Sequence, residues 1–265
     1  MIGQKFLKMQ FEKFNLTNLP KSLLFIGVEG SGKKTFIHWF ADSLALQVVE
    51  IDGSADSVRD ITNMCNKMLN ATIYLIPEVD KMSMAAQNSL LKVLEEPPEN
   101  AYFMLTSSQD DLVLPTIKSR CFTYRMDQYS REELEEYMRD KNYNDFIDDT
   151  LSICSCPGEI NLLYSQDVKA FLDYVTLVYD NIAKVSGANS FKISSKINLA
   201  EDNDKYDLAL FWRAFMSMCL REVDSMKRIQ GILITSRYYS DLKIKGLNKQ
   251  MCFDNWLLSL RREWM

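Results

Sequence analysis

A glycine-rich segment that ends in lysine could bind the phosphates of a nucleotide. Gly27-Val28-Glu29-Gly30-Ser31-Gly32-Lys33 follows an apolar stretch and precedes an amphipathic one, so it is predicted to join a strand to a helix. In such a loop glycines let backbone N–H groups converge on an anion, and the lysine reaches the β- and γ-phosphates. The alternative is a glycine-rich turn without a ligand. The candidate nucleotide-binding residues are Gly27, Gly30, Gly32, Lys33, Lys34 and Thr35.

The groups that would hold magnesium are missing from this candidate site. A phosphate loop continues with Ser or Thr, whose hydroxyl binds Mg²⁺, but Lys34 stands there and Thr35 comes one residue too late. The apolar run Ile73–Ile76 should be followed by an Asp that organises the metal, but Pro77 follows it. Glu78 remains where a base that activates water would lie. We expect no ATP hydrolysis by this chain, weak ATP or ADP binding at most, and no bound metal.

Composition restricts the class of protein. An apolar fraction of 47% and a charged fraction of 25% are typical of a globular chain. A net charge of −5 argues against a protein that binds DNA alone through a broad positive surface. The six cysteines form no Cys-x-x-Cys pair and His38 is the only histidine, so no zinc site is expected. Without a leader or a long apolar run, the sequence predicts a cytoplasmic protein that does not contact membranes.

The elements that must position the candidate residues alternate between Ser22 and Met126. Five short apolar runs are predicted strands, and three amphipathic stretches between them are predicted helices. The strands are Leu23–Ile26, Val48–Ile51, Ile73–Ile76, Tyr102–Thr106 and Phe122–Arg125, and the helices are Lys33–Leu44, Val58–Leu69 and Ala85–Leu94. This order predicts an α/β fold with a parallel sheet and helices on both faces. The candidate site should lie at the carboxyl ends of the strands.

From Ser130 onward the sequence predicts only helices. Ser130-Arg131-Glu132-Glu133 has the pattern of a capping box, and its helix should end near Asp140. A short helix should end at Cys154, and Pro157-Gly158 should separate it from a helix at Ile160–Tyr164. Further helices are predicted at Ala170–Val185, Tyr206–Gln230, Gly231–Lys245 and Phe253–Arg262, with a loop at Ser186–Asp204. The aromatic residues near Trp212 are interpreted as helical core.

A series of motifs between Glu78 and Cys121 shows a family resemblance. They are Asp80-Lys81-Met82, Gln87–Lys92, Leu94–Asn100, Leu114–Ile117 and Ser119-Arg120-Cys121, in this order. The series closely resembles AAA+ clamp-loader subunits of bacterial DNA polymerase III, most of all the delta-prime type. Ile2-Gly3-Gln4 resembles the Val-Gly-Gln box of that family, and Leu247–Leu258 is similar to its last collar helix.

The resemblance implies a fold, a set of domains and partners. It implies a RecA-like AAA+ module over residues 1–128 with a degenerate P-loop, a helical lid over 129–167 and an all-α collar for oligomerisation over 168–265. The partners it implies are other clamp-loader subunits in a hetero-pentameric ring, a sliding clamp, and primer-template DNA contacted through the assembly. A chain this short suggests a compact bacterial or phage version.

The resemblance also assigns a role to one arginine. In this family the Ser-Arg-Cys motif places an arginine against the γ-phosphate held by a neighbouring subunit, and Arg120 matches that position. A guanidinium there neutralises charge on the transferred phosphoryl group. The alternative is a surface arginine in a salt bridge. Thr106 and Ser107 stand where active relatives have a polar sensor, and their two candidate roles are a hydrogen bond to phosphate and capping of the strand end. Cys154–Glu159 lacks the sensor arginine of the family's lid.

Three functions are compatible with these features. The leading hypothesis is a clamp-loader subunit that does not hydrolyse ATP and supplies Arg120 in trans, with Glu78 as a remnant of the Walker B motif. The first alternative is an active AAA+ ATPase subunit with an unusual P-loop. The second is an AAA+ adaptor that has been repurposed for another partner.

Overall fold

A computed structural model describes residues 2–54, 61, 65, 70–182, 206–242, 244 and 246–264. The predicted helix Val58–Leu69, apart from Ile61 and Cys65, and the predicted loop Ser186–Asp204 lie outside the described residues. Contacts divide the chain into one unit of residues 1–133 with 156–158, and another of residues 134–155 with 159–265. None of the described helices is both long and apolar enough to cross a membrane. The three-domain division stays a prediction.

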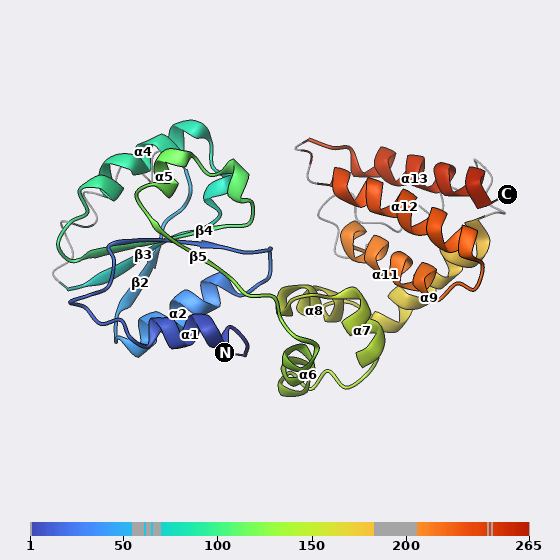
Figure 1. Cartoon of the computed structure of the whole chain (residues 1–265), viewed down its shortest axis with the longest axis horizontal. Coiled ribbons are helices and arrows are strands. Elements are labelled where there is room, and N and C mark those ends of the chain that lie inside the picture. Colours follow the sequence, from blue (N-terminus) through green and yellow to red (C-terminus); the bar gives the residue numbers. More distant parts are fainter. Residues whose placement is uncertain are drawn as a thin grey trace. The chain divides into compact units, whose positions relative to one another are not determined.

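The first unit is built on a five-stranded parallel sheet with the order β2-β3-β4-β1-β5 (Figure 1). Its strands are β1 (Ser22–Ile26), β2 (Gln47–Glu50), β3 (Thr72–Ile76), β4 (Ala101–Ser107) and β5 (Phe122–Arg125). Every residue of β1, β3 and β4 is buried, as expected for central strands covered on both faces. The five predicted strands are confirmed, each to within one residue at either end.

Helices cover both faces of this sheet. Helices α1 (Lys5–Phe11) and α2 (Lys33–Ser43) lie on one face, and α4 (Met84–Glu95) and α5 (Pro115–Lys118) lie on the other (Figure 1). Side chains alternate along β1, so that Phe25 packs in the core with Phe36 of α2, and Leu24 packs in the core with Leu90 of α4. Helix α1, which the sequence analysis did not predict, contributes the buried ring of Phe11 to the α2 side. Short 3₁₀ turns, η1 (Val79–Lys81) and η2 (Asp110–Leu112), follow β3 and β4.

The remaining described elements are helical. They are α6 (Arg131–Asp140), α7 (Ile147–Ile153), α8 (Pro157–Tyr164), α9 (Val168–Asn181), α11 (Leu208–Leu220), α12 (Ser225–Asp241) and α13 (Lys249–Trp264). The predicted capping box is confirmed, because the Ser130 N–H donates to Glu133 Oε2 at 3.1 Å and the Glu133 N–H donates to Ser130 Oγ at 3.2 Å. Trp212 of α11 is fully buried, as predicted for a helical core.

Two predicted helix boundaries are wrong in the α11–α12 region. The predicted helix Tyr206–Gln230 is two helices, because Asp224 caps α12 by accepting from the N–H groups of Met226 and Lys227. Gly231 lies within α12 and does not start a helix. A Cβ atom at Gly231 would come within 2.6 Å of Cys219 Sγ, so this glycine permits the close packing of α11 and α12.

The start of α8 also differs from the prediction. The helix begins at Pro157 and not at Ile160, so Pro157-Gly158 belongs to its first turn. Proline fits there because the first N–H groups of a helix have no partner within the helix. Placing the dipeptide in the helix brings Gly158 against the glycine loop, as described below.

Candidate functional site

The loop between β1 and α2 has the backbone of a phosphate-binding turn. Gly30 and Gly32 have φ angles of 79° and 85°, in the left-handed region that favours glycine, and Gly32 caps α2. Gly27 continues β1, and its N–H donates to Ser107 O at 3.1 Å. The sequence therefore placed the loop correctly at the carboxyl end of the sheet.

The ammonium of Lys33 is hydrogen-bonded within this loop. It donates to Gly27 O at 2.6 Å, to Val28 O at 2.9 Å and to Ser108 Oγ at 3.5 Å. The residue is buried, and burial lowers the pKa of its ammonium, an effect that Asp80 and then Glu29 partly oppose. All three ammonium protons thus have protein acceptors, and a phosphate would have to displace them.

The two positions that should organise magnesium hold other groups. Lys34 donates to Glu50 Oε1 at 2.5 Å, which places an ammonium where a metal-binding hydroxyl would stand. Pro77 directly follows β3 and has no carboxylate. Within the described residues no group of three or more His, Cys, Asp or Glu side chains could hold a metal ion. With an ammonium and a proline at the two positions that should organise magnesium, the residues present do not fit a magnesium nucleotide.

Glu78, the candidate remnant of the Walker B motif, is held on both its backbone and its side chain. Its backbone has a φ of 51°, and its N–H donates to Thr106 Oγ1 at 3.0 Å. Its carboxylate accepts from Lys81 Nζ at 2.9 Å, and this contact is the main reason why the pKa of Lys81 is raised. Thr106 thus fixes a turn at the strand end, one of the two roles considered for it.

Three consecutive carbonyls of the loop are covered by residues from beyond the sheet. Glu29 O accepts from Cys156 Sγ at 3.4 Å, Gly30 O accepts from the Gly158 N–H at 3.0 Å, and Ser31 O accepts from the Tyr129 hydroxyl at 3.0 Å. A Cβ atom at Gly158 would lie 2.3 Å from Gly30 Cα, so only glycine permits this approach.

This covering of the loop was not predicted. From the sequence, Cys154–Glu159 was expected to end one helix, to precede the next and to lack the sensor arginine, but no contact with the glycine loop was expected. Tyr129 was not singled out, since a lone tyrosine after a strand carries no pattern.

Arg120 is held by a different part of the same unit. Its Nε donates to Glu95 Oε1 at 2.8 Å, a second guanidinium nitrogen donates to the same oxygen, and its third nitrogen donates to Thr116 O at 2.9 Å. The side chain remains 30% exposed. These contacts within the chain are compatible with both interpretations of Arg120, as a finger at rest and as a salt-bridged surface residue.

The neighbours of Arg120 keep its segment in place. Gln87 of α4 is buried, donates to Leu112 O at 3.1 Å and accepts from the Leu114 N–H at 3.0 Å. These bonds tie α4 to the chain just before α5, which leads to Arg120. Cys121 packs against the core on the α4 side of the sheet, and burial raises the pKa of its thiol to about 12.

Comparisons with known proteins relate this chain to subunits of DNA polymerase III. Residues 54–130 match the family model described as DNA polymerase III, delta subunit. The chain is 36% identical over 101 residues to DNA polymerase III subunit delta' of Buchnera aphidicola subsp. Schizaphis graminum, a match that covers 37% of this chain and 31% of that protein. The resemblance of the chain to clamp-loader subunits of the delta-prime type is confirmed.

Other proteins similar to this chain include a gamma subunit of DNA polymerase III and a related protein of known structure. The chain is 28% identical over 190 residues to DNA polymerase III subunit gamma of the same Buchnera strain, which covers 58% of this chain and 52% of the relative. The chain spans about half the length of the first curated relatives it matches. A DNA polymerase III gamma-subunit-related protein from Thermotoga maritima has a similar structure, with a TM-score of 0.57, 19% identity, and coverage of 98% of this chain and 99% of that one. The predicted AAA+ fold is confirmed.

Proposed function

We propose that this chain is a clamp-loader subunit that does not hydrolyse ATP and that supplies Arg120 in trans to a nucleotide held by a neighbouring subunit. One contrast carries the proposal. Lys33 and the loop carbonyls are engaged within the chain, whereas Arg120 is held at a partly exposed position chiefly by one carboxylate, that of Glu95. The first site is closed to a nucleotide, and the second can exchange its partner.

The chemistry of Arg120 supports this role. A guanidinium is planar and always charged, and its paired N–H groups match two oxygens of a carboxylate or a phosphoryl group. Glu95 is 49% exposed on its side chain, so a phosphoryl group of higher charge could replace it without burying an unpaired carboxylate. The side chain of Glu95 is then the resting partner of the arginine.

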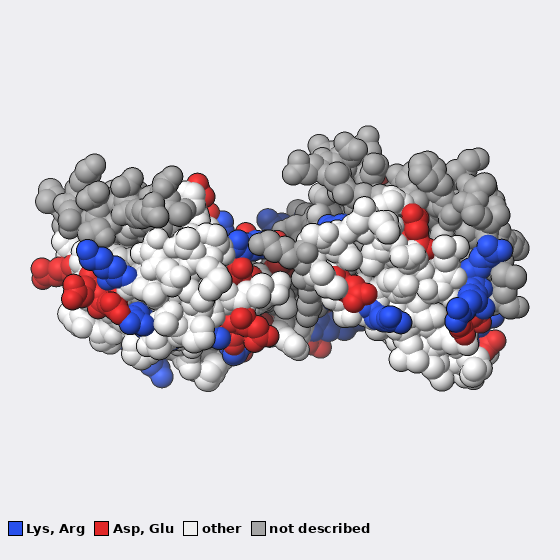
Figure 2. Space-filling model, turned by 90° about the horizontal axis from the view of Figure 1, so that it is seen from above, with Lys and Arg blue, Asp and Glu red and all other residues white. Residues whose placement is uncertain are grey.

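The proposed partners follow from the same role. They are other subunits of a hetero-pentameric ring, a sliding clamp, and primer-template DNA reached through the assembly, in a cytoplasmic setting. On the face shown in Figure 2, the coloured Lys, Arg, Asp and Glu side chains form small separate groups among uncharged residues. Together with the net charge of −5, this favours DNA contact by the assembly over DNA binding by the chain alone. The AAA+ module, lid and collar over residues 1–128, 129–167 and 168–265 are the proposed parts of this subunit.

The first test measures ATP turnover and ATP binding by the isolated chain. We expect no turnover above background and weak or absent binding in calorimetry, because Lys34 and Pro77 replace both groups that position magnesium. Turnover that disappears on Lys33→Ala would contradict the proposal and support the active-ATPase alternative. The double change Lys34→Thr with Pro77→Asp should increase Mg²⁺-dependent binding more than either single change, since both groups bind one ion.

The second test concerns the partners. The tagged chain should copurify from its native source with ATPase subunits and a sliding clamp. Copurification with a stable partner of another kind, without these proteins, would support the repurposed-adaptor alternative.

A further inference from the structure

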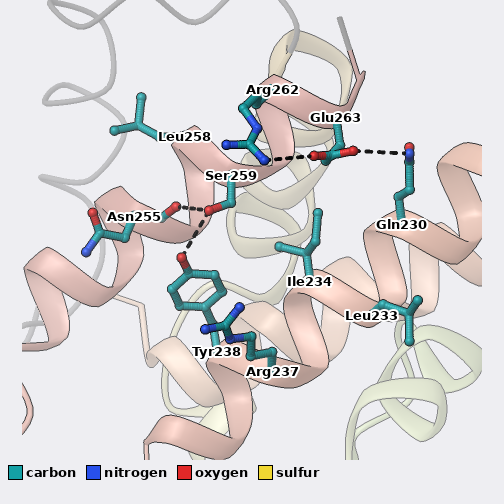
Figure 3. A pocket seen from close by; sticks show the side chains of 10 residues that line it. All are labelled: Gln230, Leu233, Ile234, Arg237, Tyr238, Asn255, Leu258, Ser259, Arg262 and Glu263. Carbon is teal, nitrogen blue, oxygen red and sulfur yellow. Dashed lines mark hydrogen bonds and ion pairs between the residues drawn. The ribbon is translucent and has the colours of Figure 1, made fainter.

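A groove runs between α12 and α13 on the helical unit (Figure 3). The helices are antiparallel, since Gln230 pairs with Glu263 near one end and Tyr238 pairs with Ser259 farther along. Each helix contributes five lining side chains at the spacing i, i+3, i+4, i+7 and i+8, beginning at Gln230 and at Asn255. The cavity volume is about 610 Å³. We call this feature the α12–α13 groove.

Hydrogen bonds between the two helices fix the shape of the groove. The Tyr238 hydroxyl lies 3.0 Å from Ser259 Oγ, and Gln230 Nε2 donates to Glu263 Oε2 at 3.4 Å (Figure 3). Below them, the buried Trp256 indole donates to Thr235 Oγ1 at 3.0 Å. A ligand would therefore meet a largely formed surface, which lowers the entropic cost of binding.

Exposed apolar side chains line the groove and continue beyond it. Leu233 is 65% exposed and Leu258 is 47% exposed. On α12 the same face continues through Met226 and Ile229, which are 63% and 51% exposed. Single exposed apolar residues are ordinary, but 226, 229 and 233 follow the spacing of one helical face. This repetition indicates a contact surface.

The charges at the groove favour an acidic ligand. Arg237 and Arg262 both line it, against the single carboxylate of Glu263. Arg262 lies 3.5 Å from Glu263 Oε1 and its side chain is 86% exposed. Among the described residues, the guanidinium of Arg237 has neither a hydrogen bond nor an ion pair. The groove thus combines apolar walls with an excess of positive charge.

We propose that the α12–α13 groove binds an amphipathic helix of a partner protein, with one apolar face flanked by carboxylates. The lining positions on each helix span eight residue steps, about 12 Å or two helical turns, so the bound segment has anchors at i, i+3 or i+4, and i+7. Carboxylates beside these anchors pair with Arg237 and Arg262. The inference is independent of the proposed role of Arg120, since it rests only on residues of α12 and α13.

Two synthetic helical peptides of about five turns test the proposal on the full chain. They share one leucine face and differ only in the flanking residues, which are Glu in one peptide and Lys in the other. In fluorescence anisotropy we expect the Glu peptide to bind in the micromolar range, as is usual for a small interface, and the Lys peptide to bind at least about tenfold more weakly. The double variant Arg237→Glu with Arg262→Glu should reverse this preference, and Leu233→Asp should abolish binding of both.

Matched changes at exposed positions outside the groove serve as controls. Arg139→Glu on α6 and Leu177→Asp on α9 should leave the binding of both peptides unchanged, and circular dichroism should show that every variant folds. Absence of Glu-peptide binding, equal binding of the two peptides, or full binding to the double arginine variant would overturn the proposal. A concentration-dependent dimer that Leu233→Asp dissociates would also overturn it, because a second copy would then occupy the groove.

Discussion

The glycine loop after β1 and the segment that carries Arg120 hold their charged groups in opposite ways. In the loop, Lys33 is buried and donates to acceptors of its own chain, and three loop carbonyls are covered. Arg120 is 30% exposed and is held chiefly by the carboxylate of Glu95. A phosphate-binding loop can thus keep its backbone shape while its polar groups are satisfied internally. Under the proposed function, it is the accessibility of a charged group, more than its presence in a motif, that separates the remnant Lys33 from the working residue Arg120.

The largest effect is expected from Arg120→Ala in a loader reconstituted with native partner subunits. ATP turnover should fall by a factor on the order of 10³ or more, as for arginine fingers generally. Arg120→Lys should restore little, because lysine keeps the charge but lacks the planar fork. The isolated subunit should lose only about 0–1 kcal/mol of stability, as for an exposed ion pair.

This prediction is checked by measuring the melting temperature of the subunit beside the turnover of the assembly. Full turnover with Arg120→Ala would establish the salt-bridge interpretation of Arg120. The glycine loop and the segment that carries Arg120 would then no longer differ in function.

The next effect concerns the contact of Gly158 with Gly30 of the glycine loop. In Gly158→Ala the new Cβ would lie 2.3 Å from Gly30 Cα and 3.0 Å from Gly30 O, so backbone must move. We expect the free energy of unfolding in urea to fall by about 1–3 kcal/mol, as for overpacking. Gly53→Ala is the control, because its closest neighbour is the flexible Met82 side chain at 3.1 Å, and it should change stability by less than about 0.5 kcal/mol. Equal stability of the two variants would show that Gly158 does not pack tightly against Gly30.

A smaller effect is expected from Glu95→Gln in the reconstituted loader. Loss of the carboxylate charge weakens the resting contact of Arg120, so the concentration of ATP needed for half-maximal turnover should fall about twofold to fivefold, the equivalent of one exposed ion pair. Glu96→Gln changes the adjacent residue in the same way and should have no effect. An increase in that concentration with Glu95→Gln would mean that Glu95 positions the arginine for catalysis and does not compete for it.

The smallest effect is a pH dependence that originates in Lys33. Because the fold lowers the pKa of this ammonium, the unfolded chain binds more protons between the folded and the unfolded values. The contribution of Lys33 to the free energy of unfolding should therefore rise with pH in the alkaline range up to its ordinary value of 10.5. Urea unfolding between pH 8 and pH 10 should show a smaller rise for Lys33→Met than for the unchanged chain. Identical slopes would indicate that the ammonium is solvated.

The sheet was predicted well because each central strand is a short continuous run of apolar residues. The apolar runs of β1, β3 and β4 are buried at every position, and few other structures accept such runs between turn residues. The predicted boundary at Gly231 failed because a glycine that permits close helix packing looks the same in sequence as one that ends a helix.

The site was predicted as a set of residues but not as an arrangement. The positions of Gly30, Gly32 and Glu78 follow from the order of strands and turns. The covering of the loop does not, since Tyr129 and Gly158 are about 100 and 130 residues away along the chain and contact it only through tertiary structure. The ammonium of Lys33 donates to two carbonyls of its own loop, a contact that the motif alone does not predict, because the same lysine could also reach a phosphate.

The position of Glu95 at the last residue of α4 has a further electrostatic consequence. The carboxyl end of a helix carries a partial negative charge, so an acidic side chain there is unfavourable by about 0.3–1 kcal/mol unless a cation neutralises it. When Arg120 leaves for a phosphoryl group in the proposed assembly, this unfavourable charge reappears at the end of α4. Under the proposed function, this unfavourable charge favours the return of the guanidinium to Glu95 once the nucleotide departs. The helix end that binds the arginine at rest is then also what makes its binding to the nucleotide reversible from one cycle to the next.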